Sequence, residues 1–302
     1  LYSIKATTDT SDGYSIVKNG DKDGYDYQTL NFDSEHWLES GLLKSTIVYR
    51  SSETELDGSG VDDDDYTGDS KFYFYQLRYE GNNWNAVLDY NEHDRQYING
   101  TETDDYDSQN KHSAVSYTNT IGAVDYTIGT DLQFYSAQFE NRGSYNSSVD
   151  KDGENYATFI NADYEHGKFV LNGGVRRDWN TLHDPVSTYR IGSGYILNDV
   201  MTVFVGTSTG FKGPTLYEMY GADNFGYTGN LDLKEEKSTS YEVGVKTNVE
   251  TEWYTFKSKS TLFTTEITDQ INYANSTYTN DTDGKTKING WDFQSQTQYE
   301  NS

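Results

Sequence analysis

The residues of this chain that could do chemistry are mainly carboxylates. Aspartate and glutamate number 49 against 23 lysine and arginine residues, which gives a net charge of −26. They gather in stretches such as 57–70 ("DGSGVDDDDYTGDS") that have the composition of loops. Hard cations such as Ca²⁺ take six to eight oxygen ligands, and clustered carboxylates from two loops could provide them. The composition therefore indicates acidic rims that bind divalent cations, or acidic loops that are simply solvated.

Other kinds of chemistry find no support in the residues. There is no cysteine, so disulfides, thiolate metal sites and cysteine nucleophiles are excluded, and the five histidines lack metal-ligand spacing. No HExxH, GxSxG, P-loop or GxGxxG motif occurs. An EF-hand is excluded because the twelfth position counted from Asp21 is Phe32, not glutamate. Nothing offers the basic stripe that nucleic-acid binding needs. We expect neither an enzyme nor a nucleic-acid-binding protein.

Segments of about ten residues that alternate apolar and polar side chains must position the acidic loops. In "KFVLNGGVRRDW", Phe169, Leu171 and Val175 fall on one face, while Asn172 and Arg176 fall on the other. Period two is the pattern of a two-faced strand, and ten residues suffice for a tilted strand to cross a bilayer. About fourteen strands are predicted, at 1–9, 25–33, 41–53, 70–80, 84–97, 110–120, 124–140, 154–165, 168–179, 187–196, 201–211, 237–248, 253–272 and 286–300.

The connections between these segments alternate in length. Short ones such as "EGNN" and "LNDV" separate long polar ones at 10–24, 54–69, 98–109, 141–153, 212–236 and 273–285. Outer-membrane barrels have short turns at one end and long loops at the other, and a soluble sandwich has no reason for this alternation. No apolar run reaches the length of a transmembrane helix. The predicted fold class is all-β, an antiparallel transmembrane β-barrel with a lipid-facing flank and a hydrated lumen.

Aromatic residues support this interpretation. They make up 15% of the chain and fall mostly near the ends of the alternating segments, at Trp84, Tyr97, Tyr156, Tyr164, Trp179, Tyr195 and Trp253. Amphipathic rings favour the membrane–water boundary, so these positions predict aromatic girdles. The alternative is cross-strand aromatic pairing in a soluble sheet.

Residues 210–238 interrupt the alternation with "GFKGPTLYEMYGADNFGYTGNLDLKEEKS". This stretch resembles the barrel signature of TonB-dependent outer-membrane receptors. The family has Phe-Lys-Ala-Pro-Thr-Leu, an aromatic loop, and then Gly-Asn-Pro-Asn-Leu-Lys-Pro-Glu-Lys-Ser. The matching positions are Phe211, Lys212, Pro214, Thr215, Leu216, Tyr217, Tyr220, Gly229, Asn230, Leu233, Lys234, Glu236, Lys237 and Ser238, and Gly290 in "KINGWDF" matches a later strand. The departures are Gly213, Leu231, Asp232 and Glu235.

The resemblance implies a 22-stranded barrel around an N-terminal plug, in the outer membrane of a bacterium. Such receptors bind a scarce, large ligand outside and import it with energy supplied through the plug by the TonB complex. We expect residues 1–302 to be one partial barrel domain of about fourteen strands, without the plug or the closing strands, and with two unpaired sheet edges.

The loop of the signature is expected to fold over the barrel mouth. Glycines allow tight bends there, and packed aromatics hold its shape without regular secondary structure. We predict that it contacts ligand through Tyr217, Tyr220, Phe225 and Tyr227. The alternative is that the loop only links two strands.

The N-terminal segment "DGYSIVKNGDKDGYDYQTLNF" resembles the start of the barrel in vitamin B12 receptors. In those receptors, acidic residues of neighbouring loops bind calcium and order the mouth for cobalamin. Ser15 replaces one aspartate of the pattern, and Asp12 stands nearby. The resemblance implies calcium ligands among Asp12, Asp21, Asp23, Asp62, Asp63, Asp64, Asp65 and Asp69.

We predict an outer-membrane receptor for cobalamin or a ferric siderophore, with outer-membrane lipid and the TonB complex as partners. Two other functions share part of the evidence. A passive porin-like or adhesin barrel has the same strand pattern but no need of the signature at 210–238. A soluble acidic β protein that binds carbohydrate agrees with the low mean hydropathy of −0.87.

Overall fold

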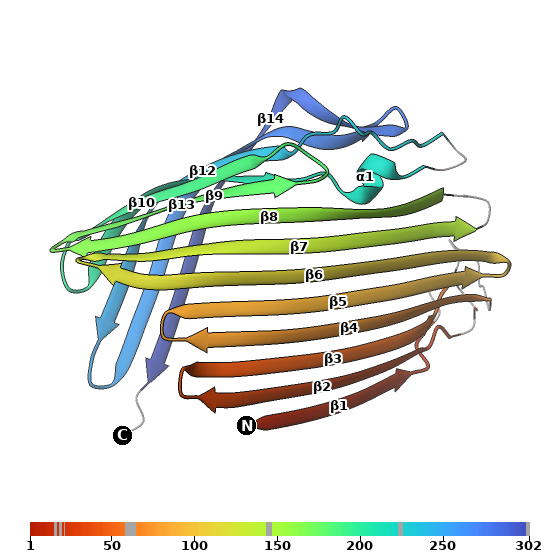
Figure 1. Cartoon of the computed structure of the whole chain (residues 1–302), viewed down its shortest axis with the longest axis horizontal. Helices are drawn as coiled ribbons and strands as arrows, with labels where there is room; N and C mark the ends of the chain where they lie inside the picture. Colours follow the sequence, from red (N-terminus) through yellow and green to blue (C-terminus); the bar gives the residue numbers. More distant parts are fainter. Residues whose placement is uncertain are drawn as a thin grey trace.

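The computed structural model describes residues 1–299 except 15–16, 18–19, 21, 58–64, 143–146 and 223–225. These residues form one sheet of fourteen antiparallel strands, in which each strand pairs with its neighbours in sequence (Figure 1). The strands are β1 (Tyr2–Ser11), β2 (Tyr25–Leu38), β3 (Gly41–Glu55), β4 (Tyr66–Gly81), β5 (Trp84–Asn99), β6 (Glu102–Ile121), β7 (Val124–Arg142), β8 (Ser147–His166), β9 (Phe169–Asn180), β10 (Val186–Ile196), β11 (Met201–Lys212), β12 (Glu236–Glu250), β13 (Tyr254–Ala274) and β14 (Thr277–Tyr299).

The sheet curves along its width into a trough (Figure 1). β1 and β14 lie at its two edges, and each is hydrogen-bonded to only one other strand. The trough is therefore an open, partial barrel; the alternating sequence predicted the barrel strands, and the family resemblance implied that only part of the barrel is present. No helix among the described residues has the length and apolar character needed to cross a membrane.

The connections differ between the two ends of the trough. At one end, two to four residues join β2 to β3, β4 to β5, and every later even-numbered strand to its successor as far as β13. At the other end, the connections include the longer segments 12–24, 56–65 and 213–235. This alternation confirms the predicted turn end and loop end.

Three of the predicted long loops are wrong in extent. Segments 98–109 and 273–285 are hairpins in which β5 and β6, and β13 and β14, pair up to two-residue turns at 100–101 and 275–276. β8 already begins at Ser147, within the predicted loop 141–153. Polar residues that alternate in these segments extend the ladder, because continued pairing satisfies the backbone groups that an irregular loop would leave to water. The strands thus run past the length that a bilayer requires.

The two faces of the sheet differ in polarity. Strand register places a row of apolar side chains on the outer, convex face, where roughly half of each side chain is exposed. Members of this outer row are Ile47, Leu77, Leu88, Val115, Ile128, Ile160, Val175, Ile191, Val205, Val243 and Leu262. Their sequence neighbours, such as Asp89 and Asn161, face the inside of the trough. An apolar outside and a polar inside are typical of a membrane barrel.

Most of the predicted girdle aromatics lie on the outer face. Trp84 and Tyr195 lie at the turn end, and Tyr156 pairs directly with Trp179 nearer the loop end. Tyr97 was predicted to join them, but the register of β5 places it on the inner face, where its ring contacts Tyr106 at a centroid distance of 6.0 Å. Alternation decides the face of an aromatic, and Tyr97 is an odd number of residues from Leu88.

On the inner face, several aromatic rings lie over a glycine directly opposite on the neighbouring strand, and four of them lie closest. The pairs are Phe159 over Gly129, Tyr135 over Gly153, Phe204 over Gly244 and Phe263 over Gly290. A Cβ added to any of these glycines would lie 2.4–2.5 Å from the ring. Because glycine has no side chain, each ring can lie against the backbone of the neighbouring strand, as in aromatic rescue of sheet glycines. This explains the match at Gly290.

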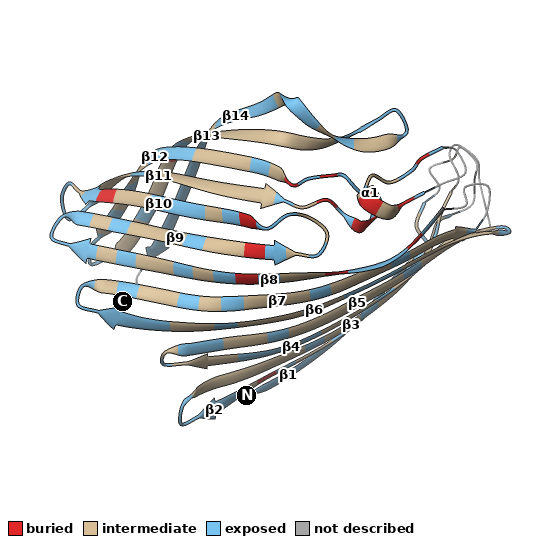
Figure 2. Ribbon diagram, turned by 45° about the horizontal axis from the view of Figure 1, so that its top comes forward, coloured by how far each residue is buried: buried red, intermediate tan, exposed pale blue. Residues whose placement is uncertain are grey.

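Buried side chains are few and gather in one place. Seven hydrophobic residues are buried among those described, and Leu216, Met219, Tyr227 and Leu233 all belong to segment 213–235. Figure 2 shows this buried patch around the short helix α1 (Leu216–Tyr220), while the strands are largely half-buried or exposed. The described chain has no packed dry interior between two layers. Its compact part is the loop that connects β11 to β12.

Candidate functional site at the loop end

Segment 213–235 begins with a capped turn of helix. Thr215 caps α1, because its Oγ1 accepts from the backbone N–H of Glu218 at 3.2 Å. The Glu218 carboxylate accepts in turn from the N–H of Thr215 at 2.7 Å, which completes a capping box. At the other end, the N–H of Gly221 donates to the carbonyl of Tyr217. The signature residue Thr215 therefore has a local structural role.

Glycines allow the segment to fold back on itself. The N–H of Gly229 donates to the carbonyl of Gly221 at 2.6 Å, and that of Asn230 donates to the carbonyl of Glu218 at 3.0 Å. A Cβ at Gly229 would lie 2.4 Å from the carbonyl oxygen of Met219. Only glycine permits this approach of two backbones, which accounts for the match at this position.

The folded segment is docked on the extended hairpin of β13 and β14. The Asn230 side chain donates to the carbonyl of Tyr278 at 2.9 Å. Asn280 accepts from the N–H of Lys234 at 2.8 Å and donates to its carbonyl at 2.9 Å. The N–H of Thr228 donates to the carbonyl of Ser276. The predicted loop 273–285 is thus the ordered platform that holds the signature segment.

The charged residues at the start of β12 form ion pairs. Lys212 contacts Glu236 at 2.9 Å, and Lys237 contacts Glu235 at 3.1 Å. Glu235 is buried, with 6% of its surface exposed. Burial alone would raise the pKa of its carboxyl, but a backbone hydrogen bond and Lys237 outweigh burial and hold that pKa below its usual value.

A row of aromatic rings runs from the inner wall into the docked segment. Phe139 lies between Tyr106, at 4.5 Å, and Tyr217, at 5.9 Å. Tyr227 stacks on Tyr217 at 5.1 Å and meets the ring of Tyr278 edge-on at 5.9 Å. The sequence prediction missed Tyr106 and Phe139, because only their strand register directs them inward.

The predicted ligand-binding aromatics differ in accessibility. Tyr217 is 41% exposed, whereas Tyr227 is 4% exposed and donates its hydroxyl to the carbonyl of Tyr217 at 2.6 Å. Burial and the nearby Tyr217 raise the pKa of Tyr227. The half-buried ring of Tyr220 lies 5.3 Å from the ammonium of Lys151 on β8. Phe225 lies outside the described residues.

The remaining signature residues line the ends of this segment. Pro214, Leu216 and Leu233 are buried, and Phe211 packs edge-on against His183 at 5.7 Å. Ser238 pairs with Gly210 in the β11–β12 ladder. Most of the signature therefore builds and fastens the segment, and Tyr217 and Tyr220 remain as its accessible aromatics.

Of the predicted calcium ligands, Asp12, Asp23, Asp65 and Asp69 are described, and Asp21, Asp62, Asp63 and Asp64 lie outside the described residues. Asp69 belongs to strand β4 rather than to a loop. It lies opposite Glu53, which lies opposite Asp26, so three carboxylates follow one another across β2–β4.

A cavity of about 340 Å³ next to this acidic row is lined by Asp12, Asp26, Glu53 and Glu55. One carboxylate oxygen of Asp26, Oδ1, is buried and has no hydrogen-bond partner. Within the described ranges, no group of three or more His, Asp or Glu side chains is arranged to hold a metal ion. Sequence analysis missed Asp26, Glu53 and Glu55, which stand in alternating strand sequence and not in acidic runs.

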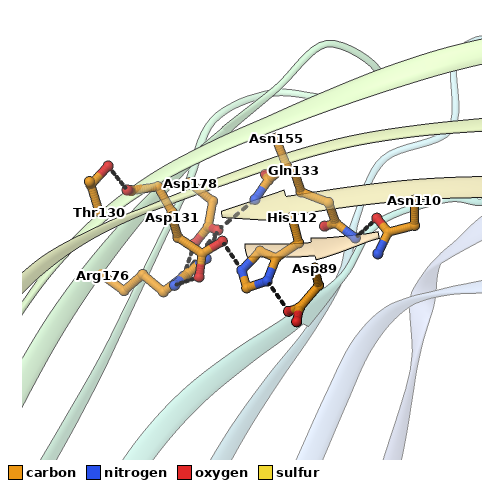
Figure 3. Close-up of polar contacts among 10 residues, drawn as sticks. Asp89, Asn110, His112, Thr130, Asp131, Gln133, Asn155, Arg176 and Asp178 are labelled. Atoms are coloured by element: carbon orange, nitrogen blue, oxygen red, sulfur yellow. Dashed lines mark hydrogen bonds and ion pairs between the residues drawn. The ribbon is translucent and has the colours of Figure 1, made fainter. Parts of the chain in front are cut away.

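Polar side chains from β5 to β9 form a network on the inner wall (Figure 3). His112 lies between two carboxylates, with Nδ1 2.9 Å from Asp89 and Nε2 3.1 Å from Asp131. Arg176 contacts Asp131 at 3.4 Å and forms a bidentate pair with Asp178, whose side chain is 3% exposed. Within this network the charged side chains of Asp89, His112, Asp131, Arg176 and Asp178 satisfy one another.

A family model described as TonB dependent receptor-like, beta-barrel, matches residues 5–301. Among curated proteins, the vitamin B12 transporter BtuB of Vibrio vulnificus (strain YJ016) is 26% identical over 259 residues, which are 81% of this chain and 41% of that protein. BtuB of Photobacterium profundum is 28% identical over 118 residues, 39% of this chain and 18% of that protein. The chain spans less than half the length of these relatives.

Solved structures share the fold at lower identity. The copper transporter OprC superposes with a TM-score of 0.73 at 15% identity, over 100% of this chain and 54% of that one. The hemophore receptor HasR of Serratia marcescens gives 0.74 at 13% identity, over 91% and 52%. The ferric-catecholate import receptor Fiu from E. coli K12 gives 0.70 at 14% identity, over 97% and 58%.

Proposed function

The chain belongs to the TonB-dependent receptor-like β-barrel family, and from this premise we propose that it is part of an outer-membrane receptor that imports a cobalamin. The observation that carries the proposal is the similarity to vitamin B12 transporters over 81% of the chain. The docked segment 213–235 supports it, because it presents Tyr217 at the mouth of the trough on a hydrogen-bonded base.

A ferric siderophore is the second candidate ligand. It is favoured by the likeness to Fiu, which extends over 97% of the chain. That likeness has 14% identity and concerns the fold, whereas the likeness to the vitamin B12 transporters is found in the sequence itself. We therefore place cobalamin first.

We propose outer-membrane lipid and the TonB complex as partners. The outer row of apolar side chains provides the surface that lipid tails would cover. TonB coupling would act through a plug domain, by likeness to the family. We also propose that the protein carries out transport and no catalysis.

We further propose that calcium orders the loops at the N-terminal edge. The acidic row and the unpartnered oxygen of Asp26 fit a hard cation, which prefers carboxylate oxygen. Asp12, Asp26 and Glu55 would hold the ion together with predicted ligands from the acidic loops, such as Asp21 and Asp62. Calcium would offset the repulsion between carboxylates that lie directly opposite one another.

Equilibrium binding of cyanocobalamin to the whole receptor in detergent tests the proposal. We expect cyanocobalamin to bind, and a ferric catecholate not to displace it. Tyr217→Ala should weaken binding about tenfold, as for the loss of a buried aromatic contact. A calcium chelator should also weaken binding. Asp26→Asn should bind as the wild type does in chelator, with no response to added calcium.

Tyr75→Ala, which removes an exposed tyrosine from the outer face, is the matched control and should bind normally. If a ferric catecholate displaced cyanocobalamin, a ferric siderophore would become the proposed ligand in place of cobalamin. If neither ligand bound, a passive porin-like or adhesin barrel would become the better account. Full solubility of the protein without detergent would favour the soluble carbohydrate-binding alternative.

A further inference from the structure

Two lysines on the inner wall lie directly opposite each other near the turn end of the trough. Lys246 on β12 pairs with Lys259 on β13 in the strand register. Like charges directly opposite on neighbouring strands repel. Among the described residues, neither lysine forms an ion pair within 4 Å, although the chain has 49 acidic residues. Two positive charges are therefore held together without a protein counterion.

Both ammonium groups share one aromatic ring. The Nζ atoms of Lys246 and Lys259 lie 5.6 and 5.1 Å from the centroid of Phe204. Phe204 lies over Gly244, where a Cβ would be 2.5 Å from the ring. The absence of a side chain at Gly244 lets the Phe204 ring lie against the neighbouring strand. The ring then attracts both ammonium groups through cation–π interactions. The strand pairing and the shared ring therefore determine the spacing of the two charges.

An unpartnered hydroxyl belongs to the same place. Thr261, on the inner face of β13, is 4% exposed, and its Oγ1 has no hydrogen-bond partner. A buried hydroxyl without a partner costs stability, so its presence requires a reason. Thr261, Lys246 and Lys259 all line a cavity of about 740 Å³ on the inner wall, which is within the size range of small-molecule sites.

Three acidic residues line this cavity, Glu165, Glu242 and Asp292, and in the described chain none of them forms an ion pair with Lys246 or Lys259. Glu242 lies over the neighbouring strand, with its carboxylate 3.1 Å from the position of a Cβ at Gly206. Asp292, opposite Thr261 on β14, accepts from the side chain of Gln294 at 3.0 Å. Neither carboxylate pairs with a lysine of the site in the described chain. The counterion must therefore come from outside this wall.

We propose that Lys246, Lys259 and Thr261 form a binding site for a small oxyanion, that is, a phosphate or carboxylate group. Such a group accepts charge-assisted hydrogen bonds from both ammonium groups and a further one from the hydroxyl. It also removes the repulsion between the two lysines. The site goes beyond the import function proposed above, because none of its three residues belongs to the loop-end segment that carries that proposal.

Isothermal titration calorimetry on the protein in detergent, at matched ionic strength, tests the site with inorganic phosphate and with citrate. We expect Lys246→Gln and Lys259→Gln each to weaken anion binding about tenfold, the loss of one charge-assisted hydrogen bond. Lys151→Gln is the matched control, since Lys151 also lies over an aromatic ring, at the opposite end of the trough. It should leave binding unchanged.

Thr261→Val separates a binding role from a structural one. The substitution removes the unpartnered hydroxyl and keeps the side-chain shape, so the anion-free protein should melt at a higher temperature. At the same time, it should bind phosphate several-fold more weakly. A rise in melting temperature with unchanged binding would remove Thr261 from the site.

Three results would overturn the proposal. One is the absence of measurable binding of either anion up to millimolar concentration, and another is equal affinity in the two lysine variants, the control and the wild type. The third is binding of a polyglutamate peptide with no binding of phosphate or citrate, which would assign the lysines to a polypeptide partner. Cobalamin binding is measured separately, so failure of the oxyanion site leaves the import proposal intact.

Discussion

Leu231 and Leu233 stand two residues apart in the signature segment, yet their surroundings are opposite. Leu231 is 63% exposed, and Leu233 is 4% exposed. Leu231 occupies a position where the family has proline, and Leu233 matches the family. Leu233 stands beside Lys234, whose backbone is bound on both its N–H and its carbonyl by Asn280 of the β13–β14 hairpin, whereas Leu231 lies at the surface of the segment.

This contrast gives a matched pair of substitutions. Leu233→Ala should destabilise the docked segment by about 2–4 kcal/mol, since it removes a buried side chain and leaves a cavity. Leu231→Ala should change its stability by less than about 0.5 kcal/mol. Limited proteolysis within 213–235 measures the difference. Equal cleavage rates in the two variants would show that the segment is not packed as described.

Glu235 makes the docking of the segment depend on pH. Its pKa is lowered in the folded protein from the usual 4.5. A carboxyl with a lowered pKa stabilises the fold above its unfolded value, and this contribution is lost as pH falls through the folded value. At pH 7, we expect the backbone N–H of Asn230 to be better protected from hydrogen exchange in the wild type than in Glu235→Gln. In acid, below the folded pKa of Glu235, the protection in the two proteins should become equal. A constant difference across this range would contradict the assignment.

At the scale of elements, glycines determine where aromatic side chains lie on the inner wall. Gly290 and Phe263 lie directly opposite each other, as do Gly244 and Phe204. A side chain at either glycine would displace a ring. In the sequence these glycines stand among alternating residues, and nothing in the alternation reveals which ring lies over them.

Gly290→Val should lower stability by about 1–3 kcal/mol, the usual cost of overpacking. The control is Gly173→Val, because a Cβ at Gly173 lies no closer than 3.7 Å to its nearest neighbour. Thermal unfolding in detergent measures both. A melting temperature in Gly290→Val equal to that of the control would show that Phe263 moves aside freely.

At the scale of the whole molecule, the two faces of the curved sheet meet different environments. Leu88 is 56% exposed on the outer face, and its neighbour Val87 lines a cavity on the inner face. The strand register keeps this division from β1 to β14, with one register shift, in β13 between Thr268 and Gln270. A long, exposed apolar face needs a cover, and lipid tails provide one.

Arginine at adjacent positions tests the division. Leu88→Arg should destabilise the protein in lipid vesicles by about 2–4 kcal/mol, the cost of a cation on the lipid face near the midplane. Val87→Arg places the same charge on the hydrated inner face and should cost less than about 1 kcal/mol. Denaturant unfolding in vesicles compares them. If Val87→Arg were more destabilising than Leu88→Arg, the assignment of the inner and outer faces would be wrong.

The sequence alone determined the features that depend on neighbouring residues. Alternation predicted fourteen strands and their two faces, turn lengths predicted the two ends, and the signature at 210–238 predicted the family. It also singled out Gly229 and Leu233, which the structure places at a close backbone approach and in a buried position.

Only the tertiary structure decided the features that join distant parts of the chain. Lys246 and Lys259 carry no special signal in the sequence and become one site through the pairing of β12 with β13. Tyr106 reaches Tyr217 through Phe139, over more than a hundred residues of chain. Residues 273–285, the end of the β13–β14 hairpin, were predicted as a loop and form the platform for segment 213–235. These contacts depend on the register of the strands and on the curvature of the sheet. A period-two pattern does not determine the register, because a shift by two residues leaves every side chain on the same face.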